Sequence, residues 1–378
     1  MTTVVTGVPI PAVPITDAFA ASHYPVSAAE AATALHASTN GSMPRGLCTK
    51  LSEAVDSFPL RIMIVDNSGS MQEGDGQRLV PNGAGTMRTL RSSRWHELGD
   101  DVVQVAQMSE ALQCRTDVHL LNPRPGFSAM TVGPPKSWDL VAPLGRSVDA
   151  ETVKTAMTRT SPGGTTPLTE ACMQIVSMIE PAAAALRARG EQVCVIIATD
   201  GMPNNRATFV AAMQHLQRLP VWVVVRLCTN DDDIVGYWND LDAQLEAPLE
   251  VLDDVKSEAD EIHAVNRWLT YGPPLHSARL FGLPGKVFDD LDEKALLPWQ
   301  LKEFLEDLLG ADVLGAGGLP EPELDPRAFA EAVGSALGGL PPVYDPRQSK
   351  MRPWVDTRAL ERHVARAKRG GDAVCSIM

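Results

Sequence analysis

Three residues with oxygen-bearing side chains occupy alternate positions directly after an apolar run. The segment reads Asp66-Asn67-Ser68-Gly69-Ser70, a DxSxS pattern. Because alternate residues leaving a strand point the same way, we expect Asp66, Ser68 and Ser70 to turn three oxygens toward one point. Oxygen donors without His or Cys nearby favour hard cations, Mg²⁺ or Mn²⁺ before Ca²⁺. With a single carboxylate among the three, coordination positions are left for water or an incoming ligand.

Two further segments with oxygen donors follow along the chain. A Gly-rich loop at 161–168 (SPGGTTPL) presents Thr165 and Thr166 at the start of a predicted helix. Asp200 ends the most apolar run and precedes Gly201. Ligands of open α/β sheets bind beyond the carboxyl ends of the strands, so we expect all three segments at one edge of the sheet.

The order DxSxS, GGTTPL and an apolar strand ending in TDG resembles the metal-ion-dependent adhesion site (MIDAS) of the von Willebrand factor type A (vWA) family. The resemblance covers roughly residues 59–251, about half of the chain. The segment SFPLRIMIVDNSGSM, with Ser93-Arg94-Trp95 further on, is more similar to uncharacterised eukaryotic cytosolic vWA proteins than to secreted adhesion proteins.

The resemblance implies a role for each predicted ligand. Ser68 and Ser70 would bind the metal directly, and Asp66 and Asp200 directly or through water. Thr166 would supply the hydroxyl of the second loop, because family members commonly read T-P-L before a helix; Thr165 is the alternative. In the family a carboxylate of the partner often completes the metal shell. The resemblance therefore implies a metal-dependent protein-binding module, not an enzyme.

Other interpretations of the same residues stay open. Asp and Ser also favour turns and helix caps, so DxSxS alone has a purely structural interpretation. A calcium-binding EF-hand loop is excluded because Met71 stands where Gly is required. A hydrolase or phosphotransferase using the same cation is one alternative, although a two-metal site would need further carboxylates, such as Asp231–Asp233. A lipid-anchored adaptor with a vestigial metal site is another. Thr199 is expected to support Asp200.

Four short β-branched runs provide the elements that would position these residues. They are expected to form strands buried on both faces of a parallel sheet, at 60–65, 118–121, 193–198 and 221–228. Helical patterns at 93–113, from 169 with a break at Pro181, and at 206–219 separate them. This alternation predicts an α/β fold with a doubly wound, mostly parallel, Rossmann-like sheet.

The whole chain divides by composition into four parts. We predict a flexible N-terminal arm at 1–45 (with a helical stretch at 27–37), a vWA domain at 46–255, a helical extension at 256–345, and a basic helix with a tail at 346–378. Within the extension, 288–309 and 329–337 have helical patterns. The polar, Gly-rich insert Gln72–Ser92 follows the first motif directly, which leaves open whether it covers the site.

Composition limits the setting and the partners. The formal net charge of −14 argues against nucleic acid as a partner. Six cysteines stand singly, without CxxC pairs or a signal-peptide pattern, which predicts reduced thiols and a cytoplasmic location. No stretch approaches the ~18 apolar residues of a membrane-spanning helix.

The sequence ends Cys375-Ser376-Ile377-Met378, which matches a prenylation box. Its terminal Met would favour farnesylation of Cys375 in a eukaryote, and the alternative is an ordinary basic helix end. One lipid chain binds membranes weakly and needs a second signal. Basic residues at helical spacing would supply it on the cytoplasmic face of a membrane, namely Arg358, Arg362, Arg366, Lys368 and Arg369.

Overall fold

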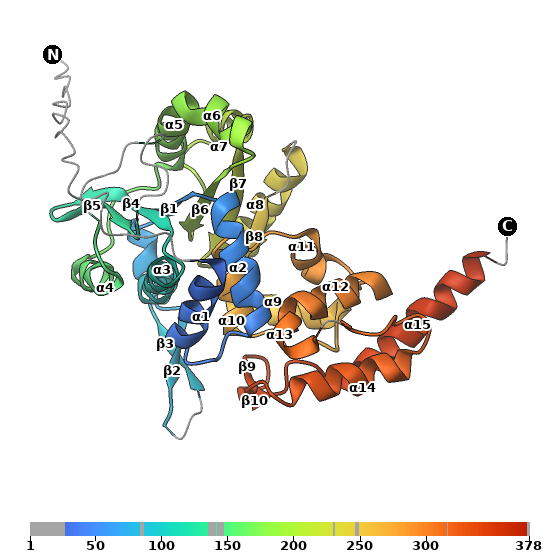
Figure 1. Cartoon of the computed structure of the whole chain (residues 1–378). Coiled ribbons are helices and arrows are strands. Elements are labelled where there is room, and N and C mark those ends of the chain that lie inside the picture. The colour runs from blue at the N-terminus through green and yellow to red at the C-terminus, as the bar shows by residue number, and fades with distance from the viewer. Residues whose placement is uncertain are drawn as a thin grey trace, which may run out of the picture.

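The computed structural model describes residues 27–83, 87–134, 141, 147–229, 231–245, 249–315 and 317–375, with only the backbone for 242–243 and 368–375 (Figure 1). Its centre is a six-stranded sheet in the order β5-β4-β1-β6-β7-β8. The strands are β1 (Leu60–Val65), β4 (Arg115–Arg124), β5 (Phe127–Val132), β6 (Val193–Thr199), β7 (Val221–Leu227) and β8 (Glu250–Leu252). Only β5 runs antiparallel to its neighbour.

The predicted α/β class with a mostly parallel sheet is confirmed. Every residue of β1 and of β6 is buried, because helices cover both faces of the sheet. Alternate side chains of β1 enter two separate cores. Met63 and Val65 join the first core, whereas Ile62 and Ile64 join the second.

The first four α-helices of the described chain cover one face of the sheet, and the next four cover the other. The first core is covered by α1 (Ala28–Ser38), α2 (Arg45–Ser57), α3 (Arg94–Ala111) and α4 (Ala150–Arg159), and the second by α5 (Leu168–Ile179), α6 (Ala183–Arg189), α7 (Arg206–Gln217) and α8 (Asp232–Gln244). The break expected at Pro181 is present as the 3₁₀ turn η3 (Glu180–Ala182) between α5 and α6.

The predicted N-terminal arm contains a packed helix. Ala31, Ala32 and Leu35 of α1 are buried in the first core. Ser27 and Glu30 form a reciprocal capping box that begins this helix. Folded structure therefore begins well before residue 46, and residues 1–26 lie outside the described part of the chain.

The C-terminal helices share the first core with α1–α3, and the last two pack on α12 (Pro298–Leu309) and on each other (Figure 1). They are α9 (Val255–Val265), α10 (Pro273–Leu280), α11 (Lys286–Glu293), α12 (Pro298–Leu309), α13 (Ala311–Leu314), α14 (Pro326–Leu337) and α15 (Thr357–Cys375), with a small hairpin of β9 (Val343–Asp345) and β10 (Lys350–Arg352). Arg61 of β1 anchors them: its Nε donates to the Phe281 carbonyl at 2.9 Å, and its guanidinium lies 3.9 Å from that ring's centre. The predicted helical stretch 288–309 is two helices, with Pro298 beginning the second.

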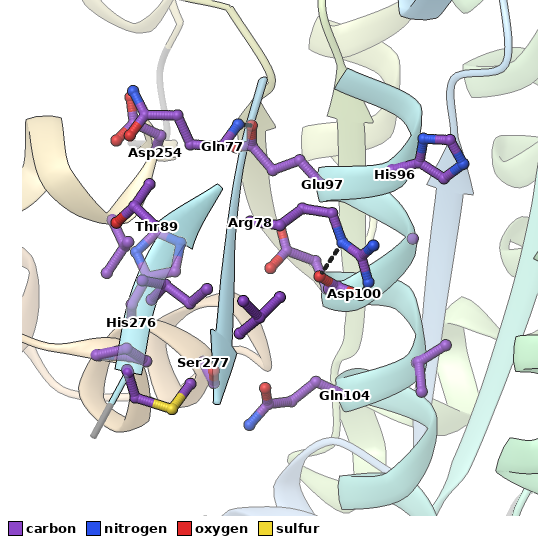
Figure 2. A pocket seen from close by; sticks show the side chains of 18 of the residues that line it. Gln77, Arg78, Thr89, His96, Glu97, Asp100, Gln104, Asp254, His276 and Ser277 are labelled. Carbon is purple, nitrogen blue, oxygen red and sulfur yellow. Dashed lines mark hydrogen bonds and ion pairs between the residues drawn. The ribbon is translucent and has the colours of Figure 1, made fainter. Parts of the chain in front are cut away.

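The insert after the first motif forms a hairpin of β2 (Gly76–Pro81) and β3 (Met87–Ser92). It lies along α3, where Gln77 N–H donates to Glu97 and Arg78 forms an ion pair with Asp100 (Figure 2). A cavity of about 720 Å³ is lined by residues of the hairpin, α3 and α10, and none of the five predicted metal ligands lines it. The described part of the hairpin thus follows α3 away from the helix's first turn. Within the described residues, no helix combines the length and apolarity needed to cross a membrane.

Candidate metal centre

Asp66 and Asp200 follow adjacent strands at the point where the winding of the sheet reverses. The chain continues from β1 to β4 on one side, and from β6 to β7 on the other. Val65 pairs with Ala198, and Asp66 N–H extends the ladder with a 2.9 Å bond to the Ala198 carbonyl. A crevice at such a switch point is the usual ligand site of an open α/β sheet.

Four of the five predicted ligands are joined by short polar contacts. The hydroxyls of Ser68 and Ser70 lie 3.1 Å apart, and Ser70 Oγ donates to Asp200 Oδ1 at 2.9 Å. Asp66 Oδ1 accepts from Ser68 N–H at 2.8 Å, which curves the chain after β1 back toward the carboxylate. The DxSxS spacing therefore brings its oxygens to one place, beside Asp200.

The Gly-rich loop is tied to the DxSxS segment through its backbone. Gly163 N–H donates to the Asn67 carbonyl at 2.7 Å, and Gly69 N–H donates to the Gly164 carbonyl at 3.2 Å. Gly164 has φ +104°, and a Cβ there would lie 2.6 Å from Asn122 Oδ1, so the close approach requires glycine. These contacts fix the loop over the end of β1.

The two loop threonines have different surroundings. A Cβ at Gly201 would lie 3.8 Å from Thr166 Oγ1, so the Thr166 hydroxyl flanks the residue after Asp200. The side chain of Thr165 is exposed, and its carbonyl accepts a 2.8 Å bond from Asn122 Nδ2. This placement agrees with the choice of Thr166, whose role as a ligand stays a prediction.

The oxygen atoms are spaced as a small octahedral cation requires. Bonds of 2.0–2.1 Å to Mg²⁺ put neighbouring ligand oxygens about 2.8–3.0 Å apart, against about 3.3–3.7 Å for Ca²⁺. The Ser68–Ser70 and Ser70–Asp200 separations are 3.1 and 2.9 Å. Hydrogen bonds hold these oxygens at similar separations, so a cation could take the place of the hydrogen bonds, with each hydroxyl turning its proton away, with little movement of the oxygens. The residues present fit Mg²⁺ or Mn²⁺.

Both carboxylates are buried, with Asp66 0% and Asp200 1% exposed. The pKa of Asp66 is raised to about 6, mainly by burial; the hydrogen bond from Thr199 opposes this rise, and the charge of Asp200 adds to it. Burial also raises the pKa of Asp200, against hydrogen bonds from Arg94 and Ser70. Two buried acids at one point favour a bound cation.

Thr199 has a different partner from the one expected. Its hydroxyl donates to Asp66 Oδ2 at 2.6 Å and accepts from Gly201 N–H at 3.2 Å. Thr199 therefore supports Asp66 across the two strands, and the expectation that it supports Asp200 is wrong. The reason is strand geometry: successive side chains point to opposite faces of the sheet, so the Thr199 hydroxyl does not turn to the same point as the Asp200 carboxylate.

Arg94 is a charged neighbour of the site that the sequence pattern does not predict. Its Nη1 lies 3.0 Å from Asp200 Oδ2, and its Nε and Nη2 lie 2.8 and 2.6 Å from the two oxygens of Asp75. The sequence signal was a cationic residue directly after the helix cap Ser93, at the first turn of α3. Only the folded chain shows that this turn lies beside Asp200.

Two other predicted features have separate outcomes. Asp231 accepts from Asp233 N–H at 3.0 Å at the start of α8, as expected of a capping residue. Cys375 ends α15, and the three residues after it lie outside the described part of the chain, so lipidation stays a prediction.

A second acidic cluster lies among the C-terminal helices. Carboxylate oxygens of Glu258, Glu261 and Asp292 come within 4.8 Å of one another. Arg279 already pairs with Glu258 at 2.6 Å and with Asp292 at 3.4 Å. We assign no metal to this cluster, because a buried guanidinium supplies its positive charge.

No protein-family model matches the sequence, and no curated protein matches it. Among solved structures, the chain is similar to manganese-loaded TRAP protein of Plasmodium vivax, with a TM-score of 0.30 and 16% identity over 52% of this chain and 69% of that one. It is also similar to proximal thread matrix protein 1 from the mussel byssus, with a TM-score of 0.28 and 17% identity over 45% of this chain and 38% of that one. Both likenesses are distant.

Proposed function

We propose that the chain is a protein-binding module whose site holds Mg²⁺ or Mn²⁺ through Asp66, Ser68, Ser70, Thr166 and Asp200. The observation that carries the proposal is the convergence of carboxylate and hydroxyl oxygens from three distant segments at the switch point of the sheet. The metal would supply an open coordination position for an acidic side chain of the partner protein.

Exposure of the ligands supports binding of a macromolecule. Ser70 is exposed and Thr166 is half-buried, whereas Asp66, Ser68 and Asp200 are buried. A cation held here would have buried carboxylates below it and hydroxyls at the rim. An incoming carboxylate would therefore approach from the solvent side without displacing the chain.

Metal binding is the first test. Calorimetric titration of Mn²⁺ and Mg²⁺ into the full chain is expected to give about one ion per chain, as one octahedral site requires. Ser68→Ala/Ser70→Ala should abolish this binding while circular dichroism stays unchanged. Ser177→Ala/Ser335→Ala is the matched control, because among the described contacts both hydroxyls donate to carbonyls within their own helices. Equal metal binding by the two double variants would contradict the proposal.

Partner capture is the second test. Proteins retained by the wild-type chain in Mn²⁺ should be released by chelator and should not bind Ser68→Ala/Ser70→Ala. A partner that binds equally in chelator would place recognition elsewhere on the chain. Turnover of phosphatase or esterase substrates that needs Mn²⁺ and is lost in Asp66→Ala would favour the enzyme instead.

A further inference from the structure

Arg94 contacts two carboxylates through different nitrogens. Its Nε and Nη2 form a two-pronged pair with Asp75, and Nη1 alone reaches Asp200. The side chain of Arg94 is 12% exposed, that of Asp75 51%, and that of Asp200 0%. The guanidinium thus links a buried carboxylate of the proposed site to one at the surface.

The backbone confines any change to the Arg94 side chain. Arg94 N–H donates to the Glu73 carbonyl at 3.0 Å, directly after the 3₁₀ turn η2 (Gly69–Gln72) that carries Ser70. Ser93 caps α3 by accepting from His96 N–H. The first turn of α3 is therefore fixed to the DxSxS segment. Nη1 can separate from Asp200 through rotation within the Arg94 side chain, with no movement of the backbone.

A guanidinium and a divalent cation compete for the same carboxylate. Asp200 accepts from Arg94 at Oδ2 and from Ser70 at Oδ1, so a metal bound at Asp200 would stand beside Nη1. The positive charges of the metal and of the Arg94 guanidinium would then repel each other strongly, because little solvent screens them there. The pair with Asp75 does not use Nη1, so Arg94 has a second anion to hold it when it leaves Asp200.

From this geometry we propose that Arg94 sets the metal affinity of the site by competing with the cation for Asp200, with Asp75 as the alternative holder of the guanidinium. The proposal rests on the proposed metal site. It predicts opposite effects for the removal of Arg94 and the removal of Asp75. Removing the Arg94 guanidinium strengthens metal binding, whereas removing the Asp75 carboxylate leaves Arg94 with Asp200 alone and weakens metal binding.

The chain offers a matched control for both changes. Arg78 forms an equivalent two-pronged pair with Asp100, between the same hairpin and the same helix, with both distances at 2.6 Å. Arg78→Gln and Asp100→Asn change the net charge as Arg94→Gln and Asp75→Asn do. Neither control residue bonds to Asp200 within the described contacts, so effects of overall charge cancel in the comparison.

The test is calorimetric titration of Mn²⁺ into the wild-type chain and these four variants, with thermal unfolding in chelator and in Mn²⁺. Arg94→Gln is expected to lower the Kd about tenfold relative to Arg78→Gln, the size expected for one hydrogen bond to a charged group. Asp75→Asn should raise the Kd about threefold or more relative to Asp100→Asn. Mn²⁺ should raise the Tm of Arg94→Gln more than that of the wild type.

The outcomes separate this inference from the proposed function. Metal binding by the wild type with equal Kd in Arg94→Gln and Arg78→Gln overturns the competition and leaves the metal site standing. Binding by Arg94→Gln alone supports the competition in its strongest form. No binding by any folded variant overturns both proposals. If Arg94→Gln does not fold, the comparison of Asp75→Asn with Asp100→Asn still decides, since Asp75 is half exposed.

Discussion

The hydroxyl of Thr199 donates a 2.6 Å hydrogen bond to Asp66 Oδ2, and so connects the ends of the adjacent strands β6 and β1. Both residues are 0% exposed. Because this carboxylate is buried, water cannot replace a lost donor. The bond therefore contributes to the stability of the fold, and it lowers the pKa of Asp66 in the proposed site.

Thr199→Val keeps the shape of the side chain and removes the donor. We expect the free energy of unfolding to fall by about 1–3 kcal/mol, the usual cost of leaving a buried acceptor without its donor. Urea unfolding at neutral pH in chelator measures the change. The control is Thr158→Val, whose exposed hydroxyl bonds to a carbonyl within α4 and which should change stability by less than about 0.5 kcal/mol. Equal losses in the two variants would contradict this role of Thr199.

Asp66 should make stability depend on pH when metal is absent. Burial raises its folded-state pKa to about 6, above the ordinary value of 3.8. Between these pH values the folded chain keeps a proton that the unfolded chain has lost, so Asp66 costs stability progressively as the pH rises from about 4 to about 6. The full cost, on the order of 3 kcal/mol, persists above that range.

Asp66→Asn isolates this contribution from those of other acids. The free energy of unfolding of the wild type minus that of Asp66→Asn, measured in chelator, should fall as the pH is raised from about 4 to about 7. A difference that stays constant over this range would show that Asp66 has an ordinary pKa.

Gly164→Ala should damage the loop that carries Thr166. Its φ of +104° disfavours any side chain, and a Cβ would stand 2.6 Å from Asn122 Oδ1. We expect a loss of about 1–3 kcal/mol in stability together with weaker Mn²⁺ binding. Gly74→Ala is the control, because a Cβ there meets nothing within 4 Å. If Gly164→Ala is destabilised but binds Mn²⁺ with unaltered affinity, the loop has no part in metal binding.

Shortening the β2–β3 hairpin should leave metal binding intact. Val80 and Arg88 are paired, so replacing residues 81–87 by Asn-Gly closes the hairpin with a two-residue turn. Asp75 and Arg94 keep their places in this variant. Because the described hairpin follows α3, the Kd for Mn²⁺ should change by less than about twofold, roughly the accuracy expected for distant, independent sites. A large change in Kd would mean that the hairpin reaches the site.

Local pattern was enough to predict the sheet centre and the convergence of the ligands. Buried β-branched runs identify β1, β6 and β7, and the strand ends then place Asp66 and Asp200 at one edge. The edge strands β5 and β8 were missed because their burial is uneven or their length only three residues. Short edge strands carry little periodicity, and their pairing depends on the strand beside them.

Charged residues were predicted less well than apolar ones. The role of Arg94 depends on the distance between the first turn of α3 and β6, which no local pattern contains. His276 of α10 is 4% exposed and contacts the hydroxyl of Tyr271 at 3.1 Å, which its sequence neighbours do not indicate. In both cases the partner comes from tertiary packing, whereas an apolar stripe is visible in the sequence itself.

Met63 and Val65 of the first sheet strand belong to one apolar core with α1–α3 and with C-terminal residues as far as Leu360 and Val364 of α15. During synthesis, this core is therefore complete only after the last helices of the chain have been made. A nascent or truncated chain that ends near residue 255 would present a broad apolar plane, which attracts other chains. The segment that bears the proposed metal site shares this core with the last third of the chain, and we expect it to need that third in order to fold when it is excised or grafted onto another protein.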